Sequence, residues 1–166
     1  MSLESLNRMS EAEARHALQT CCAADRWING MVAARPFPSS EALHARAATL
    51  WATLSDEDWL QAFDAHPKIG DVTSLKKKYA NTHSLASGEQ SATAAADESV
   101  LQRLKNGNDA YADKFGFIFI VCATGKSADE MLALLEARLP NTRAQEIENA
   151  AREQAKITHI RLDKLA

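Results

Sequence analysis

Apolar residues recur three or four positions apart along most of the chain, which is the spacing of one buried helix face. The pattern predicts a first helix that opens at Ser10, carries acids in its first turn, and buries Ala14, Leu18, Cys21 and Cys22. A second helix is expected over residues 26–34 and ends at the proline-containing stretch RPFPSS. A third is expected over residues 39–54, with Ser40 as its N-cap.

A fourth helix is expected over residues 55–63. Ser55 is a typical N-cap residue, and Asp58 stands three positions later, where a capping box places an acid or amide side chain. The pattern predicts that this helix buries Trp59, Leu60 and Phe63.

The second half of the chain opens on a capping-box pattern of the S-x-x-Q type, Ser87 to Gln90. A long helix is expected behind it, because apolar and amide residues alternate three and four apart at Leu101, Leu104, Asn108, Tyr111 and Phe115. Gly107 interrupts this helix at a cost of about 1 kcal/mol relative to alanine, so a kink is expected there.

The apolar run FGFIFIVCATG, residues 115–125, is bounded by glycines and by itself predicts a buried strand. A helix over residues 126–140 should end at Pro140, and a last helix should begin near Asn141. One face of that last helix carries Ile147, Ala150, Ala151, Gln154, Ile157 and Thr158. Because no repeat or linker is visible, we expect one mostly helical domain over residues 1–166.

Composition narrows the functional class. The net charge is −3, with 46% hydrophobic residues, so nothing favours nucleic acid as a partner. The longest apolar run is too short to span a bilayer, and the N-terminal residues lack the apolar core of a signal peptide. The cysteines Cys21, Cys22 and Cys122 have neither disulfide nor zinc spacing and are interpreted as core residues, as are the three tryptophans. We therefore expect a cytoplasmic protein that binds no membrane.

The stretch DAHPKIGD, Asp64 to Asp71, is the first candidate for chemistry. Pro67 keeps His66 out of the α region, so the imidazole should be held at the end of a helix, where backbone carbonyls favour its protonated form. Such a side chain can give and take a proton near neutral pH. The alternative is a surface or capping histidine. The other histidines, at positions 16, 44, 83 and 159, have no comparable setting.

Two further residues are candidates. Glu89 would be the second residue of the helix capped by Ser87, where the helix dipole favours a carboxylate; dipole compensation alone is the alternative. Arg161 stands four residues beyond Ile157 and therefore continues the apolar face of the last helix. It should point inward, either to pair with a core acid or to hold an anionic or carbonyl-rich ligand through its planar fork.

In combination, these motifs resemble one family. RPF at Arg35–Phe37, DWLQAFDAHPKIGD, GEQ at Gly88–Gln90, N-x-x-Y-x-x-x-FGF-x-F at Asn108–Phe119 and KITHIRL at Lys156–Leu162 occur in its order and spacing. The sequence resembles 2-oxo-4-hydroxy-4-carboxy-5-ureidoimidazoline (OHCU) decarboxylase, an enzyme of urate breakdown, over nearly the whole chain. The resemblance implies an all-α fold, a homodimer, and neither a metal nor an organic cofactor. It also implies that the apolar segment is extended or helical, in place of a strand.

The resemblance assigns roles by position. The family's catalytic histidine, glutamate and arginine match His66, Glu89 and Arg161. The residues that would line the substrate site are Pro67, Ala86, Ser87, Gly88, Gln90, Phe119, Ile120, Val121, Cys122 and Ala123. Many members have a serine three residues before the glutamate, where this chain has Ala86 followed by Ser87. That departure puts a substrate-hydroxyl contact in question.

The implied chemistry suits these residues. OHCU carries a hydroxyl and a carboxylate on one ring carbon beside a ring C=N bond, so the substrate itself accepts the electrons released with CO2. The enzyme must then add a proton to one face of the neighbouring carbon, which yields (S)-allantoin. His66 would move protons, Glu89 would orient His66 or a substrate N–H, and Arg161 would hold a carbonyl; the roles of His66 and Glu89 could also be exchanged.

Two other classes remain open on the sequence. A metal-dependent hydrolase of a small cyclic amide fits the number of histidines and acids, but no HExxH motif or clustered ligand spacing is present. A non-catalytic helical interaction module would tolerate substitution of His66.

Overall fold

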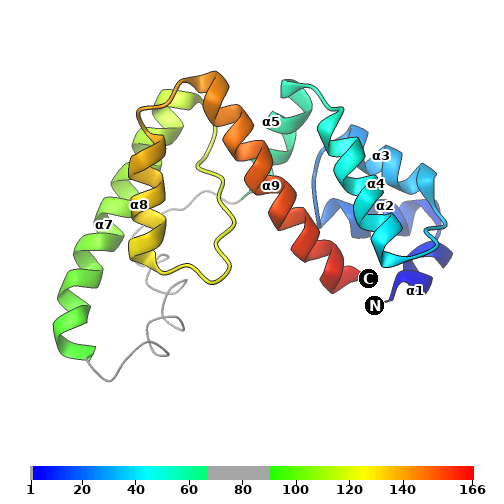
Figure 1. The fold of residues 1–166 in the computed structure, drawn as a ribbon, viewed down its shortest axis with the longest axis horizontal. Coiled ribbons are helices and arrows are strands. Elements are labelled where there is room, and N and C mark those ends of the chain that lie inside the picture. The colour runs from blue at the N-terminus through cyan, green and yellow to red at the C-terminus, as the bar shows by residue number, and fades with distance from the viewer. Residues whose placement is uncertain (1, 67–89) are drawn as a thin grey trace. The chain divides into compact units, whose positions relative to one another are not determined.

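The computed structural model describes residues 2–66 and 90–166, and for residues 90–98 only the backbone. Within these residues every regular element is an α-helix, which confirms the all-α prediction (Figure 1). The helices are α1 (Leu3–Arg8), α2 (Glu11–Gln19), α3 (Asp25–Ala34), α4 (Ser40–Ala52), α5 (Asp56–Asp64), α7 (Gln90–Phe115), α8 (Ala128–Arg138) and α9 (Arg143–Leu165). None of the helices in this part of the chain has the length and apolar character that crossing a membrane requires.

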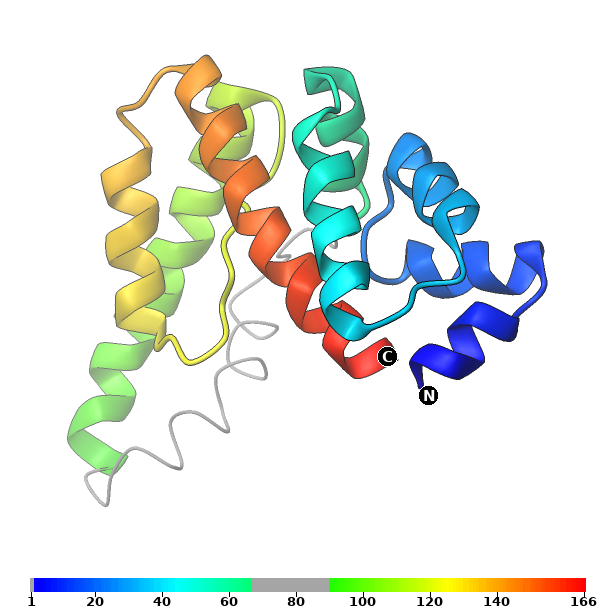
Figure 2. The same ribbon diagram turned by 45° about the vertical axis from the view of Figure 1, so that its right-hand side comes forward.

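The chain divides into two compact units. Unit 1 comprises residues 1–66, Ile120–Cys122 and Ile147–Ala166, and unit 2 comprises residues 67–119 and 123–146. The prediction of a single domain over residues 1–166 is not tested by this division. Figures 1 and 2 show α7 and α8 side by side within unit 2, and α2, α3 and α4 grouped within unit 1.

Local capping explains where the helices of unit 1 begin. Ser10 and Ser55 each form the predicted N-cap, and both complete a capping box, with Glu13 and Asp58 respectively. The prediction for α4 is wrong by one residue: Ser39 accepts the hydrogen bond from the Ala42 amide, and Ser40 is the first helical residue. The short helix α1 was not expected from the sequence.

Two of the three tryptophans, Trp27 and Trp51, and the cysteines lie in the core of unit 1, as predicted. Trp27 is fully buried and its indole N–H donates to the Ala47 carbonyl at 3.1 Å, while the Trp51 indole donates to the Ala151 carbonyl at 2.9 Å. Trp59 and Leu60 are only half-buried, so α5 contributes less to the core than the pattern predicted; Phe63 is fully buried. The Trp51 bond ties α4 to α9.

The RPF motif is structural in this fold. The Arg35 guanidinium donates to the carbonyls of Leu6 and Met9 at 3.0 and 2.7 Å, where α1 ends. The Asn7 side chain exchanges two hydrogen bonds with the Phe37 backbone. These bonds fix α1 to the turn between α3 and α4 and satisfy carbonyls that a helix end leaves without partners.

Unit 2 is built on the pair α7 and α8. The predicted face of α7 is largely correct, because Leu101, Leu104, Tyr111 and Phe115 are buried. The helix continues through Gly107 without a break. A Cβ atom at Gly107 would lie 2.6 Å from Cδ2 of Leu135, so the glycine lets α8 pack closely against α7.

A buried carboxylate joins the elements of unit 2. Glu146 is fully buried, and one of its oxygens accepts hydrogen bonds from the Tyr111 hydroxyl at 2.5 Å and the Arg138 Nε at 2.7 Å. The other oxygen accepts from the Asn141 amide at 2.9 Å. Burial, followed by the bond to Glu146, raises the pKa of Tyr111 far above its usual value, so the phenol remains a donor.

The apolar segment after α7 is not a strand. In the described residues it has no ladder partner and runs as irregular chain over 118–123, bringing Phe117, Phe119, Ile120 and Cys122 to buried positions. The resemblance predicted an extended or helical piece here, and the extended alternative is correct. Apolarity predicted burial correctly, but a strand also needs a neighbouring strand to satisfy its backbone groups.

Candidate active site

His66 follows the last turn of α5. The helix ends at the C-cap residue Ala65, and the His66 amide donates to the Phe63 carbonyl at 3.1 Å. The capping box of Ser55 and Asp58 fixes the start of this nine-residue helix. The position of His66 therefore follows from the start of α5 and from its C-cap. The histidine is half-buried, as a residue must be if it is to be both held and reached by a ligand.

The imidazole of His66 is tied to α9. Its Nε2 lies 2.5 Å from Oε1 of Gln154, whose residue is only 1% exposed. Gln154 in turn donates from Nε2 to the Thr158 hydroxyl at 3.0 Å, one helical turn further along, and the Thr158 hydroxyl lies 3.4 Å from the Cys21 carbonyl. The sequence placed Gln154 and Thr158 correctly on the inner face of the last helix but offered no indication that they connect to His66.

The electrostatic prediction for His66 is corrected by the structure. The pKa of His66 is lowered, first by burial and further by the positive charge of Arg161, while the bond to Gln154 acts in the opposite direction. The helix end therefore does not hold a protonated imidazole. The lowered pKa favours the neutral imidazole, which is the form that can accept a proton.

Arg161 lies on the same unit and within electrostatic reach of His66, but it is exposed, so the prediction that it points inward is wrong. The buried face of α9 passes through Gln154 and Thr158 to Leu162, which is fully buried, and this leaves Arg161 and the half-buried Ile157 at its margin. Within the described parts of the chain, the Arg161 guanidinium has no hydrogen bond or ion pair. A core salt bridge is therefore absent there, and the group can reach a ligand.

Several predicted site residues lie outside the described residues: Pro67, Ala86, Ser87, Gly88 and Glu89. Gln90 is the first residue of α7, and only its backbone is described. The capping box predicted at Ser87–Gln90 falls in the same stretch.

The predicted backbone wall is described. Phe119, Ile120 and Cys122 are buried, and Val121 and Ala123 are half-buried. The Cys122 amide donates to the Glu153 carboxylate of α9 at 3.0 Å, and the other oxygen of Glu153 binds the Lys156 ammonium at 2.6 Å. Glu153 thus anchors the middle of this segment to the helix that also carries Gln154 and Arg161.

The three cysteines lie in the interior of the protein. Cys21, Cys22 and Cys122 are buried and form no disulfide, which agrees with their interpretation as core residues. Burial raises the pKa of the Cys21 thiol, and it raises the pKa of the Cys22 thiol to about 11. A neutral, buried thiol is a poor nucleophile.

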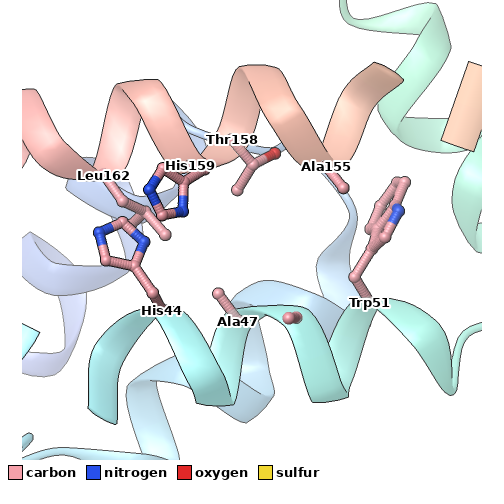
Figure 3. A pocket seen from close by; sticks show the side chains of 8 residues that line it. His44, Ala47, Trp51, Ala155, Thr158, His159 and Leu162 are labelled. Atoms are coloured by element: carbon pink, nitrogen blue, oxygen red, sulfur yellow. The ribbon is translucent and has the colours of Figure 1, made fainter. Parts of the chain in front are cut away.

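A second polar cluster was missed by the sequence reasoning, which assigned His44 and His159 no special setting. Nε2 of His44 on α4 lies 2.7 Å from Asp163 on α9, and Nε2 of His159 lies 3.6 Å from the same carboxylate. The two imidazole rings stack with their centroids 3.8 Å apart, and Figure 3 shows them side by side. One candidate ligand atom from each residue lies within 4.8 Å of the others, so the trio could hold a metal ion. Spacing along the chain could not reveal it, because two helices contribute.

Beside this cluster, Figure 3 shows a small cavity between α4 and α9, lined by His44, Ala47, Ala48, Trp51, Ala155, Thr158, His159 and Leu162. Its volume is about 50 Å³. Pockets for small organic ligands usually measure roughly 300–1,000 Å³. The cavity is therefore too small for an organic ligand of that size.

Comparison with known proteins agrees with the motifs. A family model described as OHCU decarboxylase matches residues 7–163. The chain is 37% identical over 147 residues to the Uric acid degradation bifunctional protein TTL of Arabidopsis thaliana, covering 89% of this chain and 45% of that protein. It is 26% identical to the 2-oxo-4-hydroxy-4-carboxy-5-ureidoimidazoline decarboxylase of Haloferax volcanii, covering 98% of this chain and 94% of that protein.

A solved structure, OHCU decarboxylase in the presence of (S)-allantoin, has 36% identity and a TM-score of 0.70, with 89% of this chain and 94% of that one covered. The chain spans less than half the length of the bifunctional relatives it matches, 45% of the Arabidopsis protein and 32% of one from Bacillus. The family match nevertheless extends over almost all of the present sequence, including His66 after α5 and the part of α9 that carries Gln154 and Arg161. The chain belongs to the OHCU decarboxylase family.

Proposed function

We propose that this chain converts OHCU to (S)-allantoin and CO2 in the breakdown of urate. The observation that carries the proposal is the family match over residues 7–163, which includes the predicted catalytic positions. The name of the Haloferax relative supports the same reaction, and so does the related OHCU decarboxylase crystal structure, which was determined in the presence of (S)-allantoin. The neutral, half-buried His66 suits a reaction that needs a proton acceptor.

The substrate itself supplies the acceptor for the electron pair that is released with CO2. The bond between the ring carbon and the carboxylate breaks and CO2 leaves. The released electron pair forms a C=C bond to the neighbouring ring carbon. The π pair of the C=N bond moves to its nitrogen, which takes up a proton. The hydroxyl then loses its proton to become a carbonyl, and the neighbouring carbon gains one. Overall, one carboxylate and one proton become CO2 and a C–H bond.

We assign the proton transfer from the hydroxyl to the neighbouring carbon to His66. A neutral imidazole accepts the hydroxyl proton and then returns it to one face of the adjacent carbon, which gives a single hand of allantoin. We assign to Glu89 the orientation of His66 or of a substrate N–H. Arg161, exposed and within electrostatic reach of His66, would hold a ring or ureido carbonyl.

We further propose that the substrate lies against Pro67, the residues Ala86–Gly88 and Gln90, and the backbone of the segment 119–123. The Cys122 amide already donates to Glu153, so the ligand would meet other backbone groups of that segment. We propose a single functional domain that works as a homodimer in the cytoplasm without a metal or an organic cofactor.

The test is to add the purified protein to freshly made OHCU and follow circular dichroism. One hand of allantoin should accumulate faster than OHCU decays spontaneously. His66→Asn should lower the rate about 10²–10⁴-fold, the usual contribution of a general acid–base group. His16→Asn changes an exposed histidine of α2 in the same way and should leave the rate unchanged. Racemic product formed at the spontaneous rate would overturn the proposal.

A further inference from the structure

The contacts of His66 determine which of its two nitrogens is free to take a proton. A neutral imidazole carries hydrogen on one ring nitrogen and a lone pair on the other. In proteins the choice is set by the hydrogen bond that one of the nitrogens makes. Here that bond joins Nε2 to the side-chain oxygen of Gln154 at 2.5 Å.

The donor and acceptor of this hydrogen bond follow from the contacts of Gln154 with Thr158 and of Thr158 with Cys21. The Cys21 carbonyl can only accept, so the Thr158 hydroxyl, 3.4 Å away, donates its single hydrogen there. Toward Gln154 the hydroxyl must then accept, and its neighbour must be the Gln154 amide nitrogen, 3.0 Å away. The Gln154 oxygen therefore faces His66, and because an amide oxygen can only accept, the hydrogen lies on Nε2 of His66.

Burial enforces these hydrogen-bond directions. Gln154 is 1% and Thr158 6% exposed, so water is not available to replace a lost partner. If the Gln154 amide were reversed, Thr158 would have to donate to it, and the buried Cys21 carbonyl would lose this contact. The Cys22 thiol also interacts with the Thr158 hydroxyl, but burial raises its pKa to about 11 and keeps it neutral. Because a neutral thiol is only a weak acceptor, the Cys21 carbonyl is the better acceptor for the Thr158 hydrogen.

We infer that Gln154 is a positioning residue that holds His66 in the Nε2–H tautomer and leaves Nδ1 as the nitrogen that accepts and returns the substrate proton. The assignment of the tautomer stands on the contacts alone, whereas its catalytic consequence rests on the proposed function. Gln154 also suits reversible transfer. The hydrogen bond from His66 to the Gln154 oxygen becomes stronger when the imidazole is protonated. Because the amide carries no negative charge, it holds the added proton less tightly than a carboxylate would.

The tautomer can be measured directly on the purified protein labelled with ¹⁵N-histidine. Long-range ¹H–¹⁵N spectra at a pH where His66 is neutral should show hydrogen on Nε2 and a bare Nδ1. In Gln154→Met, which keeps length but has no acceptor oxygen, we expect a mixture of both tautomers. Gln102→Met alters an exposed glutamine of α7 and should leave the His66 spectrum unchanged. A wild-type spectrum with hydrogen on Nδ1, or an unchanged spectrum in Gln154→Met, would overturn the inference.

Activity gives a second readout. Gln154→Met should lose about 10- to 100-fold in kcat, the range found when a partner that orients a histidine is removed from metal sites. Gln154→Glu keeps the shape and adds charge, so it should raise the pKa of His66 and move the acid limb of the rate profile to higher pH. An unchanged His66 titration in Gln154→Glu would contradict the direct contact. If wild-type protein shows the Nε2–H tautomer but does not process OHCU, the proposed function fails while the tautomer assignment stands.

Discussion

Replacement of Glu146 by glutamine should destabilise unit 2 more than any exposed substitution in the chain. The carboxylate is fully buried, and Tyr111, Arg138 and Asn141 all donate hydrogen bonds to its two oxygens. A glutamine amide has one acceptor oxygen and one NH2 group. Whichever way it is turned, the NH2 group faces a donor, and the Arg138 side chain, 12% exposed, loses its negative partner.

The size of the effect can be estimated from these contacts. Breaking a buried ion pair by removing one charge costs about 3–5 kcal/mol. For a protein of this length, about 1 kcal/mol lowers the melting temperature by roughly 2–4 °C, so the expected decrease is about 6–20 °C. The opposing view is that the amide retains one good acceptor and the network rearranges, in which case the cost would approach that of a single hydrogen bond, about 1 kcal/mol.

Far-UV circular dichroism in urea is the appropriate assay, because all three tryptophans belong to unit 1 and their fluorescence would not follow unit 2 directly. The matched control is Glu148→Gln, the same change at an exposed position of the same helix, which should stay within about 0.5 kcal/mol of the wild type. A Glu146→Gln protein as stable as this control would refute the reasoning that the buried carboxylate organises unit 2.

Three further results are expected. Because the folded-state pKa of His66 is lowered, the unfolded chain binds more protons below about pH 6.5, so stability should fall as pH falls through that value; His66→Asn should reduce this slope in urea titrations, and an unchanged slope would contradict the shift. Arg161→Lys keeps the charge but not the planar fork, so kcat/KM should fall about 10- to 150-fold with little change in melting temperature; equal activity would remove Arg161 from the site. Dialysis against a chelator should leave the rate unchanged, and so should His44→Ala with His159→Ala, the pair that could ligate a metal; activity lost on dialysis and restored by a divalent ion would contradict the cofactor-free mechanism.

Much of the helical architecture was readable in the chain because helices are specified locally. Ser10 and Ser55 cap the helices they were expected to cap. An N-cap hydrogen bond joins a side-chain oxygen to the amide three residues later, so the residues that form it are close together in the sequence. Most of the inner face of α7, and that of α9 as far as Thr158 apart from the half-buried Ile157, followed from the periodicity of their apolar residues. His66 was singled out for the same local reason, because the proline after it and the helix before it are adjacent in sequence.

Tertiary packing decided the rest. Whether residues 118–123 form a strand depends on the presence of a neighbouring strand, which an isolated apolar run does not reveal. The protonation of His66 was predicted from the helix end, but burial, a property of the whole unit, controls it. Gln154 lies 88 positions from His66 along the chain, and the residues of the His44 cluster come from two helices, so only the folded backbone brings these groups together. Sequence thus determined which side chains could carry the chemistry, and packing determined their partners and their charge, because desolvation and hydrogen bonding depend on contacts distant in the chain.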